Sequence, residues 1–364
     1  MNSNGLSGLR IGLIGPLPPP SGGMANQTRQ LASLLAATGA KVAIVQVNAA
    51  YKPQWVAHVP ILRAFFRLLP YLCELWREAG RSEIFHVMAN SGWSWHLYAT
   101  PAVWFGRLRG AAVVVNYRGG EADEFLRRSS RLVRFTMRRA NALIVPSGFL
   151  KAVFVKYRIA SEIVPNIVDL DRFAPHAERQ PSTPHLVVAR NLEPLYDNET
   201  AIRAFSIFKQ TFPESILTIA GNGPEEKNLR QLVAQLELGH QVRFAGRLEP
   251  EAMSALYRTA HLMLNPSLAD NMPNSLLEAW ASGLPVVSTN VGGIPYMAHD
   301  GVNVSLVRPG EPTEMAQACV QLLSSQDVWN ARSRAGLIEA QRYTWKNVRP
   351  VLLDAYHRAL QHKR

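Results

Sequence analysis

The sequence predicts an α/β protein of two domains, each with a parallel β-sheet that helices cover on both faces. Three observations carry this prediction. The chain has 364 residues, more than one hydrophobic core usually organises. Short apolar runs alternate with helical patterns through both halves. A polar, proline-bearing stretch, "APHAERQPSTPH" at 174–185, separates the halves.

The expected strands are apolar runs of a length typical of buried parallel sheets. In the first half they lie at 9–15, 41–47, 82–88, 111–117 and 141–147. In the second half they lie at 185–190, 215–221, 241–246, 261–267 and 284–290. A helix is expected at 26–37, and a last one around 348–360 packs back on the first domain. The predicted domains are therefore 1–174 together with 345–364, and 185–344.

Positive charge is concentrated in the first half of the chain. The formal net charge is +12, with 39 Lys and Arg against 27 Asp and Glu. Residues 1–184 hold 22 of the basic and 10 of the acidic residues, so the remaining 17 and 17 cancel in residues 185–364. Such a field favours an anionic partner of the first domain, either phosphate groups, a lipid surface or nucleic acid.

Composition also indicates the compartment. The two cysteines, Cys73 and Cys319, match no metal or redox spacing, which suits a reducing environment. The N-terminal stretch reads as a first strand and loop and not as a signal peptide. No apolar run is long enough to span a membrane, because Pro101, Arg107 and Arg109 break the most apolar stretch. We expect a soluble, cytoplasmic protein.

The stretch "DNMPNSLLEAWASGLP" at 270–285 has the signals of a short helix at a ligand-binding edge. Pro273 suits its first turn and Gly283 its end. Asp270, with Asn271 and Asn274, supplies capping and turn chemistry. The helix follows a predicted strand, so its N-terminus faces the sheet edge where ligands bind and favours an anion such as a diphosphate. Glu278, one turn on, can accept hydrogen bonds from a ribose diol; the alternative is an ordinary capped helix with an exposed glutamate.

Other loops point to the same edges. Gly22 and Gly23 follow the first strand, where a phosphate or sugar can approach a backbone that lacks Cβ atoms. They do not form the G-x-G-x-x-G fingerprint, so a nicotinamide or flavin cofactor is disfavoured. Arg190 ends a strand and suits bidentate contact with phosphate. Gly221 in "AGNGPE" and the pair in "VGGIP" mark two more glycine-rich strand ends. Each loop alone has a structural explanation, and together they predict a cleft.

Two amphipathic stretches carry arginines. Arg127, Arg131, Arg134 and Arg138 are spaced for one helical face. The stretch 59–77 combines aromatic residues with Arg63 and Arg67. Docking on anionic lipid or on a phosphorylated acceptor is one interpretation. A solvated helix face and ordinary core packing are the alternatives.

Metal and acid–base motifs are weak. Asp169 and Asp171 form a D-x-D pattern, but its context near the linker indicates a structural turn, and we expect no obligatory metal. No Ser/His/Asp arrangement or histidine cluster stands out, since His86, His96 and His261 have no partners at a meaningful spacing.

The chain resembles the retaining glycosyltransferases of family 4, which have the two-domain GT-B fold. The resemblance rests on the Gly-Gly loop, "VPNIVDLDRF", "VVARNLEP", "AGNGPE", "VRFAGRL", the terminal "YTW" and, most specifically, the two acids Asp270 and Glu278 around "EAWASGLPVV". It implies that Glu278 binds the ribose of a nucleotide and that Asp270 contacts the hydroxyls of the donor sugar.

The resemblance assigns further residues. The backbone of Asn271, Met272, Pro273, Asn274 and Ser275 would hold sugar and phosphate, Arg190 the diphosphate, and Gly22–Gly23 the donor–acceptor interface. Two departures concern the mechanism. The family usually pairs the arginine of a "GRL" motif with a lysine a few residues later. The corresponding stretch here, "LEPLYDNET" at 192–200, contains no lysine. The usual histidine after the fourth strand is replaced by Asn116, Tyr117 and Arg118, so Arg118 is expected to take over sugar or phosphate contacts.

The resulting hypothesis is transfer of a sugar from a UDP- or GDP-sugar to a lipid-linked or saccharide acceptor, as in cell-surface polysaccharide or glycolipid synthesis. An anionic membrane surface is an expected partner, at the inner membrane face, and nucleic acid is not. One alternative is a nucleotide-sugar epimerase of similar fold, with Glu121, Asp123 or His86 as acid–base residues. Another is a non-catalytic membrane-docking subunit. The sequence leaves the base, the sugar, the acceptor and the linkage open.

Overall fold

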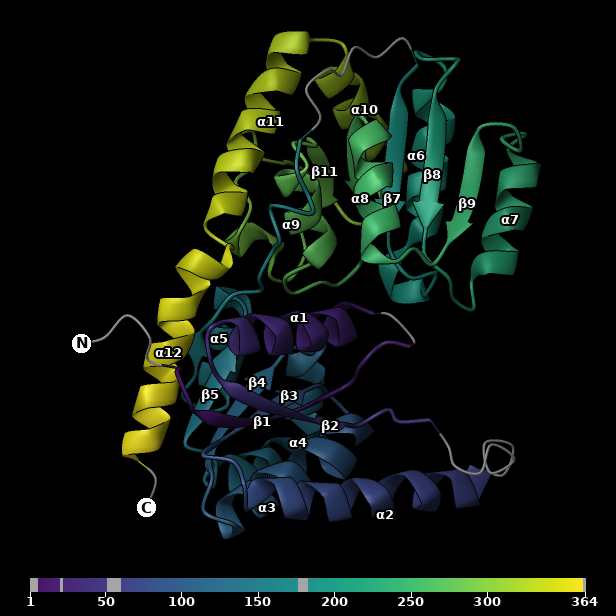
Figure 1. Ribbon diagram of the computed structural model, residues 1–364. Helices are drawn as coiled ribbons and strands as arrows, with labels where there is room; N and C mark the ends of the chain where they lie inside the picture. The colour runs from purple at the N-terminus through teal and green to yellow at the C-terminus, as the bar shows by residue number, and fades with distance from the viewer. Residues whose placement is uncertain (1–5, 20–21, 51–59, 176–182, 363–364) are drawn as a thin grey trace. The chain divides into compact units, whose positions relative to one another are not determined.

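A computed structural model describes residues 6–19, 22–50, 60–175 and 183–362, with the side chains of 60–65 left out. The chain forms two compact units. The first comprises Met1–Pro165 and Val348–Arg364, and the second comprises Asn166–Asn347. Both have a parallel sheet of six strands with helices between the strands (Figure 1).

The first unit has the strand order β2-β1-β3-β4-β5-β6. Its strands are β1 (Arg10–Gly15), β2 (Lys41–Gln46), β3 (Ile84–Ala89), β4 (Ala112–Tyr117), β5 (Ala142–Val145) and β6 (Glu162–Ile163). Its helices are α1 (Gly23–Ala37), α2 (Pro60–Ala79), the π-helix η2 (Trp95–Ala99), α3 (Thr100–Leu108), α4 (Ala122–Met137), α5 (Gly148–Lys156) and most of α12 (Trp345–Gln361). In Figure 1, α1 lies on one face of this sheet, and α2, α3 and α4 lie on the other.

The apolar runs become the central strands because both faces of the sheet are covered. Every residue of β3 and β4 is buried, and Phe85, Trp95 and Tyr117 are among the largest fully buried side chains. The predicted helix at 26–37 begins earlier, at Gly23, because Gly22 is the extended N-cap residue of α1. The glycine loop is thus largely the first turn of a helix.

The second unit has the strand order β12-β11-β10-β7-β8-β9. Its strands are β7 (His185–Ala189), β8 (Ile216–Ala220), β9 (Val242–Gly246), β10 (Leu262–Asn265), β11 (Val286–Thr289) and β12 (Ser305–Val307). Its helices are η3 (Pro194–Tyr196), α6 (Asn198–Phe208), α7 (Glu226–Gln235), α8 (Pro250–Thr259), α9 (Asn274–Ala281), η4 (Ile294–Tyr296), α10 (Pro312–Leu323) and α11 (Gln326–Gln341).

The boundary between the units lies earlier than the linker composition predicts. Residues 166–175 belong to the second unit because they bond to it. The N–H of Val168 donates to the carbonyl of Tyr343 at 2.9 Å, and Ser254 Oγ donates to the carbonyl of Arg172 at 2.6 Å. The stretch 176–182, which is most of the predicted linker, is outside the described residues.

The last helix returns to the first unit, with the crossing between Asn347 and Val348. Tyr356 of α12 is fully buried and forms a hydrogen bond with His86 of β3. Asn141 Nδ2 donates to the carbonyl of His362 at 2.8 Å. No helix in the described part of the chain is long and apolar enough to cross a membrane.

In each sheet, the direction in which successive strands are added reverses once, and this reversal is a topological switch point. In the first sheet the switch lies between β1 and β3, and in the second between β7 and β10. In open parallel sheets, ligands bind outside the carboxyl ends of the strands at such a point. The loops after these four strands are therefore the places to look for a site.

Candidate functional site

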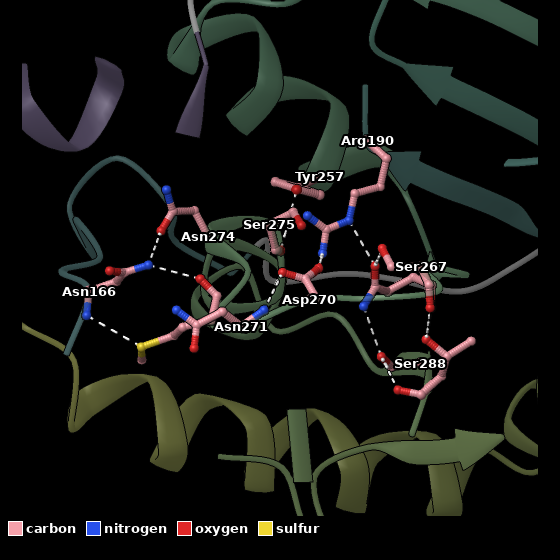
Figure 2. Close-up of polar contacts among 12 residues, drawn as sticks. Asn166, Arg190, Tyr257, Ser267, Asp270, Asn271, Asn274, Ser275 and Ser288 are labelled. Carbon is pink, nitrogen blue, oxygen red and sulfur yellow. Dashed lines mark hydrogen bonds and ion pairs between the residues drawn. The ribbon is translucent and has the colours of Figure 1, made fainter. Parts of the chain in front are cut away.

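The switch point of the second sheet brings together the residues that follow β7 and β10. Arg190 comes directly after β7, and the loop that carries Asp270 connects β10 to α9. The two strands are hydrogen-bonded neighbours, with Leu264 opposite Val188. Figure 2 shows the resulting cluster of polar side chains, which are separated widely in sequence.

An ion pair joins Arg190 Nη2 to Asp270 Oδ2, and both side chains are mostly buried, at 10% and 12% exposed. The Nε of Arg190 also donates to Asn265 Oδ1 at 2.8 Å, and its guanidinium lies 5.3 Å from the ring centre of Tyr196. The sequence predicts Arg190 and Asp270 as separate contacts to a ligand. In the structure the two side chains form an ion pair with each other, so a ligand would contact a preformed Arg190–Asp270 pair.

Asn265 is a component of the site that the sequence analysis did not single out. It ends β10, is fully buried, and accepts hydrogen bonds from Arg190 and from Ser267 Oγ at 2.9 Å. Its Nδ2 donates to Ser288 Oγ at 2.9 Å. A polar residue at the end of an apolar strand, at the predicted ligand edge, was the available signal.

Burial dominates the electrostatics of Asp270. Desolvation raises the pKa of its carboxyl group, and the charge of Arg190 opposes that shift. The N–H of Asn271 also donates to Asp270 Oδ1 at 2.9 Å. The carboxylate therefore organises its own loop and does not cap α9.

The start of α9 is held by a residue from the beginning of the second unit. Asn166 Nδ2 donates to the carbonyl of Met272 at 2.8 Å and to Asn274 Oδ1 at 2.7 Å (Figure 2). Pro273 is the N-cap residue and lies one position before the first turn predicted for it, without a side-chain cap bond. Ser275 Oγ is buried and has no hydrogen-bond partner among the described residues. An orphaned hydroxyl beside the N–H groups of a helix start fits an anionic ligand.

Glu278 lies one turn further along α9 and is half-buried. Burial raises the pKa of its carboxyl group to about 7, while Tyr257 and Arg190 oppose the shift. The hydroxyl of Tyr257 contacts Glu278 Oε2 at 3.5 Å. Near neutral pH this group is thus poised between a neutral acid and a carboxylate that accepts hydrogen bonds.

Glycines at this edge allow backbones to approach one another. A Cβ on Gly221 would lie 1.9 Å from the carbonyl oxygen of Arg190, and one on Gly293 would lie 1.9 Å from that of Asn271. The N–H of Gly293 donates to the carbonyl of Asp270 at 2.9 Å. The absence of side chains at Gly221 and in "VGGIP" is therefore explained by packing of the site loops against one another.

Other predicted residues follow β1 and β4 of the first sheet, on either side of β3. Gly22 follows β1, and a Cβ placed on it would meet open space. Arg118 follows β4 and is held by two amides, with Nε donating to Asn116 Oδ1 at 3.2 Å and Nη1 to Gln27 Oε1 at 3.5 Å. Gln27 belongs to α1, so Arg118 is tied to the helix that the glycine loop begins.

His86 has partners that its sequence neighbourhood did not reveal. It is fully buried in β3, and its ring contacts Tyr356 and Asn116. Burial, together with the charge of Arg118, lowers the pKa of His86 to about 3. A buried histidine of this kind does not suit the acid–base role of the epimerase alternative.

The four arginines predicted for one helical face lie on α4 and, in the case of Arg138, at its C-cap, and they do not form one uniform face. Arg127 is paired with Glu124, with nitrogen–oxygen distances of 2.7 and 2.9 Å, and Arg134 is half-buried. Exposed Leu132 and Phe135 lie beside them. The guanidinium of Arg139 stacks 3.8 Å from the ring centre of Trp104 on α3. Arg63 lies among the residues whose side chains are not described.

The D-x-D segment closes a turn. Asp169 Oδ1 accepts hydrogen bonds from the N–H groups of Asp171 and Arg172, at 3.1 and 3.2 Å. Within the described ranges, no group of three or more His, Cys, Asp or Glu side chains is arranged to hold a metal ion.

Two family models match consecutive parts of the chain. The model described as "Glycosyltransferase Family 4" matches residues 21–172, and the model described as "Glycosyl transferases group 1" matches residues 173–342. The chain belongs to glycosyltransferase family 4. The division between the two matches, at residues 172 and 173, lies close to the boundary between the two units at Pro165 and Asn166.

Curated relatives carry the name D-inositol 3-phosphate glycosyltransferase. The protein from Pseudarthrobacter chlorophenolicus is 31% identical over 211 residues, which are 55% of this chain and 50% of that protein. The protein from Segniliparus rotundus is 25% identical over 304 residues, 79% of this chain and 68% of that one. For several of these relatives, the matched stretch spans about half of the relative's length.

Solved structures share the fold over nearly the whole chain. Sucrose-phosphate synthase from Thermosynechococcus elongatus has a TM-score of 0.79 at 18% identity and covers 97% of this chain and 99% of that one. Anabaena Alr3699/HepE in complex with UDP and glucose has a TM-score of 0.73 at 16% identity, with coverages of 96% and 99%. This chain and these structural neighbours share the GT-B fold.

Proposed function

We propose that this protein is a retaining glycosyltransferase that moves a sugar from a nucleoside-diphosphate donor to an acceptor hydroxyl. One observation carries the proposal. The Arg190–Asp270 pair, the start of α9 and Glu278 lie together at the switch point of the second sheet. Each supplies what one part of a nucleotide sugar needs.

The donor is assigned part by part. The N–H groups at the start of α9 and the buried Ser275 hydroxyl face the diphosphate, which the helix dipole favours. Glu278, as a carboxylate, accepts hydrogen bonds from the ribose hydroxyls. Asp270 accepts a hydrogen bond from a hydroxyl of the sugar. The guanidinium of Arg190, which is paired with Asp270, also donates to the diphosphate through its other N–H groups.

The chemistry then follows from charge. The bond between the anomeric carbon and the diphosphate oxygen breaks as the acceptor oxygen forms its bond on the same face. The acceptor proton passes to the departing phosphate oxygen. Negative charge grows on the diphosphate during this step, so Arg190 and the N-terminus of α9 stabilise the transition state more than the bound donor.

UDP-sugars are the donors proposed first. The structural neighbour from Anabaena was solved with UDP and with UDP-glucose, which supports UDP recognition on this fold. A GDP-sugar is the alternative. No metal is assigned a role here, because cationic side chains and helix N–H groups serve the diphosphate.

The acceptor is proposed to bind at the switch point of the first sheet, which lies between β1 and β3. Trp93, in the loop after β3, is 78% exposed. Its loop packs beside Arg118, because a Cβ on Gly119 would lie 2.4 Å from Ser91 Oγ. An exposed indole next to hydroxyl and amide groups suits the apolar face of a pyranose ring. The proposed acceptor is thus a saccharide, with Arg118 able to bind a phosphate on it or on the donor.

A lipid-linked acceptor fits a second surface of the first unit. We define the arginine–aromatic face as Arg131, Leu132 and Phe135 of α4 together with Arg138 and Arg139, which directly follow the helix. Leu132 and Phe135 are 62% and 51% exposed between arginines. Exposed Phe66, Leu69 and Trp76 lie on α2, on the same side of the sheet (Figure 1). Apolar side chains framed by arginines suit shallow, peripheral docking on an anionic bilayer.

The donor is tested with UDP-glucose and other UDP- and GDP-sugars, by following release of the nucleoside diphosphate and by calorimetric titration. We expect binding of one nucleotide class and slow turnover without acceptor. Proton NMR of the anomeric centre of a transferred product tests retention. Binding without turnover or transfer would favour the non-catalytic alternative, and conversion of the donor sugar to its epimer would favour the epimerase.

The docking surface is tested by sedimentation with phosphatidylcholine vesicles that contain or lack phosphatidylglycerol. We expect binding only with the anionic lipid. Arg131→Glu/Arg138→Glu and Leu132→Ser/Phe135→Ser should each reduce it. Arg203→Glu, an exposed arginine of the second unit, is the control. Unchanged binding of both double variants contradicts this surface.

A further inference from the structure

A chain of buried side chains connects the last helix of the protein to Arg118. Tyr356 Oη and His86 Nδ1 are 2.8 Å apart, and His86 Nε2 and Asn116 Nδ2 are 3.1 Å apart. Asn116 Oδ1 then accepts from Arg118 Nε at 3.2 Å. His86, Asn116 and Tyr356 have exposed fractions of 2% or less. The residues come from β3, β4 and α12, and the first and last are far apart in sequence.

Each hydrogen bond in this chain has one direction. A guanidinium only donates, so the side of Asn116 that faces Arg118 must be its oxygen. Its amide nitrogen then faces His86 and donates to Nε2, which must lack a proton. Nδ1 of His86 therefore carries the hydrogen and donates to Tyr356. The tautomer of His86 and the orientation of Asn116 are both determined by Arg118.

A protonated His86 would break the chain. With a proton on Nε2, two donors would face each other across 3.1 Å. Full burial also disfavours the charged ring, in agreement with the lowered pKa of His86. The chain is thus maintained in its neutral form throughout the ordinary pH range.

The groups that hold Arg118 differ from those that hold Arg190. Arg190 is held by Asn265 and by the carboxylate of Asp270. Arg118 is oriented by the neutral amides of Asn116 and Gln27. An amide oxygen orients a guanidinium without adding a negative charge, whereas a carboxylate adds one. The buried chain therefore sets the direction of the guanidinium through a neutral group.

We propose that Tyr356, His86 and Asn116 are positioning residues that orient the guanidinium of Arg118 toward an anionic phosphate group at the first switch point. This inference rests on the proposed function for its ligand, which is a phosphate of either the donor or the acceptor. It adds that the C-terminal helix contributes to the site through three hydrogen bonds.

The sharpest test compares two substitutions of one residue. His86→Gln keeps one acceptor and one donor, so it can accept from Asn116 and donate to Tyr356. His86→Leu keeps similar bulk and removes both bonds. We expect His86→Leu to weaken phosphate binding about tenfold, the loss of one hydrogen bond to a charged group. His86→Gln should remain within about threefold of the wild type, less than half of that free energy.

Asn116→Asp separates charge from geometry. The carboxylate still fits between Arg118 and His86, but it adds a negative charge beside the phosphate site, which repels an anionic ligand. We expect phosphate affinity to fall about tenfold or more, although the fold is kept. Tyr356→Phe should weaken binding as His86→Leu does. Tyr343→Phe is the control, since it removes a buried tyrosine hydroxyl bonded to Glu339 at 3.1 Å in the second unit.

Calorimetry has two arms that distinguish the sources of phosphate. One measures the Kd of UDP, and the other the Kd of inorganic phosphate with UDP saturating. A loss confined to the first arm assigns Arg118 to the donor, and a loss confined to the second assigns it to the acceptor. Wild-type affinity in both arms for His86→Leu and Asn116→Asp overturns the proposal, as does equal loss in His86→Leu and His86→Gln.

A spectroscopic measurement on the wild type tests the hydrogen-bonded chain even if the variants fold poorly. Nitrogen-15 NMR of the wild-type His86 ring should show a bare Nε2 and a protonated Nδ1, and a protonated Nε2 would also refute the chain. Failure here leaves turnover of the UDP-sugar by the wild type intact. Failure of the proposed function shows instead as no binding of UDP and no turnover of the donor by the wild type.

Discussion

Glu278→Gln is expected to make the free protein more stable and to weaken its binding of UDP. The carboxyl group has a pKa of about 7 in the folded protein against an ordinary value of 4.5, with burial as the main cause. Glutamine has nearly the same shape and carries no charge. The substitution therefore removes a desolvation cost in the free protein and an acceptor for the ribose in the complex.

The magnitude follows from linkage. Below pH 4.5 the group is protonated in both folded and unfolded chains and has no cost. Between pH 4.5 and about 7 the unfolded chain releases its proton first, so stability falls as pH rises. Above pH 7 the accumulated cost is about 3 kcal/mol, from 1.36 kcal/mol per pKa unit. The gain from Glu278→Gln should thus be about 3 kcal/mol at pH 8 and less than about 1 kcal/mol at pH 5.

Urea denaturation at both pH values, followed by circular dichroism, measures this difference. Glu199→Gln, at an exposed glutamate of α6, is the control and should change stability by less than about 0.5 kcal/mol. Calorimetry with UDP completes the experiment. A Glu278→Gln variant that is no more stable than wild type at pH 8, or equally stabilised at both pH values, would falsify the assigned burial cost.

Three further outcomes follow from the same site. UDP affinity of the wild type should fall by up to about tenfold per pH unit below about pH 7, since only the Glu278 carboxylate has both oxygens as acceptors for the ribose diol, and titrations at pH 6 and 8 measure this. Arg190→Leu should destabilise the protein by about 3–5 kcal/mol, because it leaves Asp270 buried and unpaired, and adding Asp270→Asn should recover part; equal losses contradict the pair. Gly293→Ala should cost about 1–3 kcal/mol and weaken UDP binding, because its Cβ meets a carbonyl oxygen at 1.9 Å, whereas Gly239→Ala, with open space, should do neither.

The fold was predictable from the sequence because its signals are local. Runs such as 111–117 are apolar throughout, and a strand buried on both faces needs no partner information to be recognised. The family motifs likewise predict a shared location for Arg190, Asp270 and Glu278. Ligands of open parallel sheets bind at the carboxyl ends of the strands, and all three residues follow such ends in the second sheet.

Pairwise contacts were not predictable in this way. Arg190 and Asp270 are adjacent only because β7 and β10 are neighbours, and strand order is not visible in either segment. His86 and Tyr356 are 270 positions apart. The unit boundary at Pro165 depends on hydrogen bonds that begin at Asn166, while the sequence offered only the composition of a linker. Contacts between distant segments need the register of the sheet, which composition and periodicity do not contain.

The return of α12 has a consequence for the order in which the protein forms during translation. The first unit needs residues of α12 for its interior, since Tyr356 packs against β3. At usual rates of synthesis, these residues emerge roughly 10 to 40 s after residue 165. The second unit is continuous from Asn166 to Asn347 and lacks no later segment. The half that is translated first is therefore completed last. In a nascent-chain complex with a linker fused after residue 347, so that the chain has left the ribosome up to that point, the second unit should be folded beside an unfinished first one.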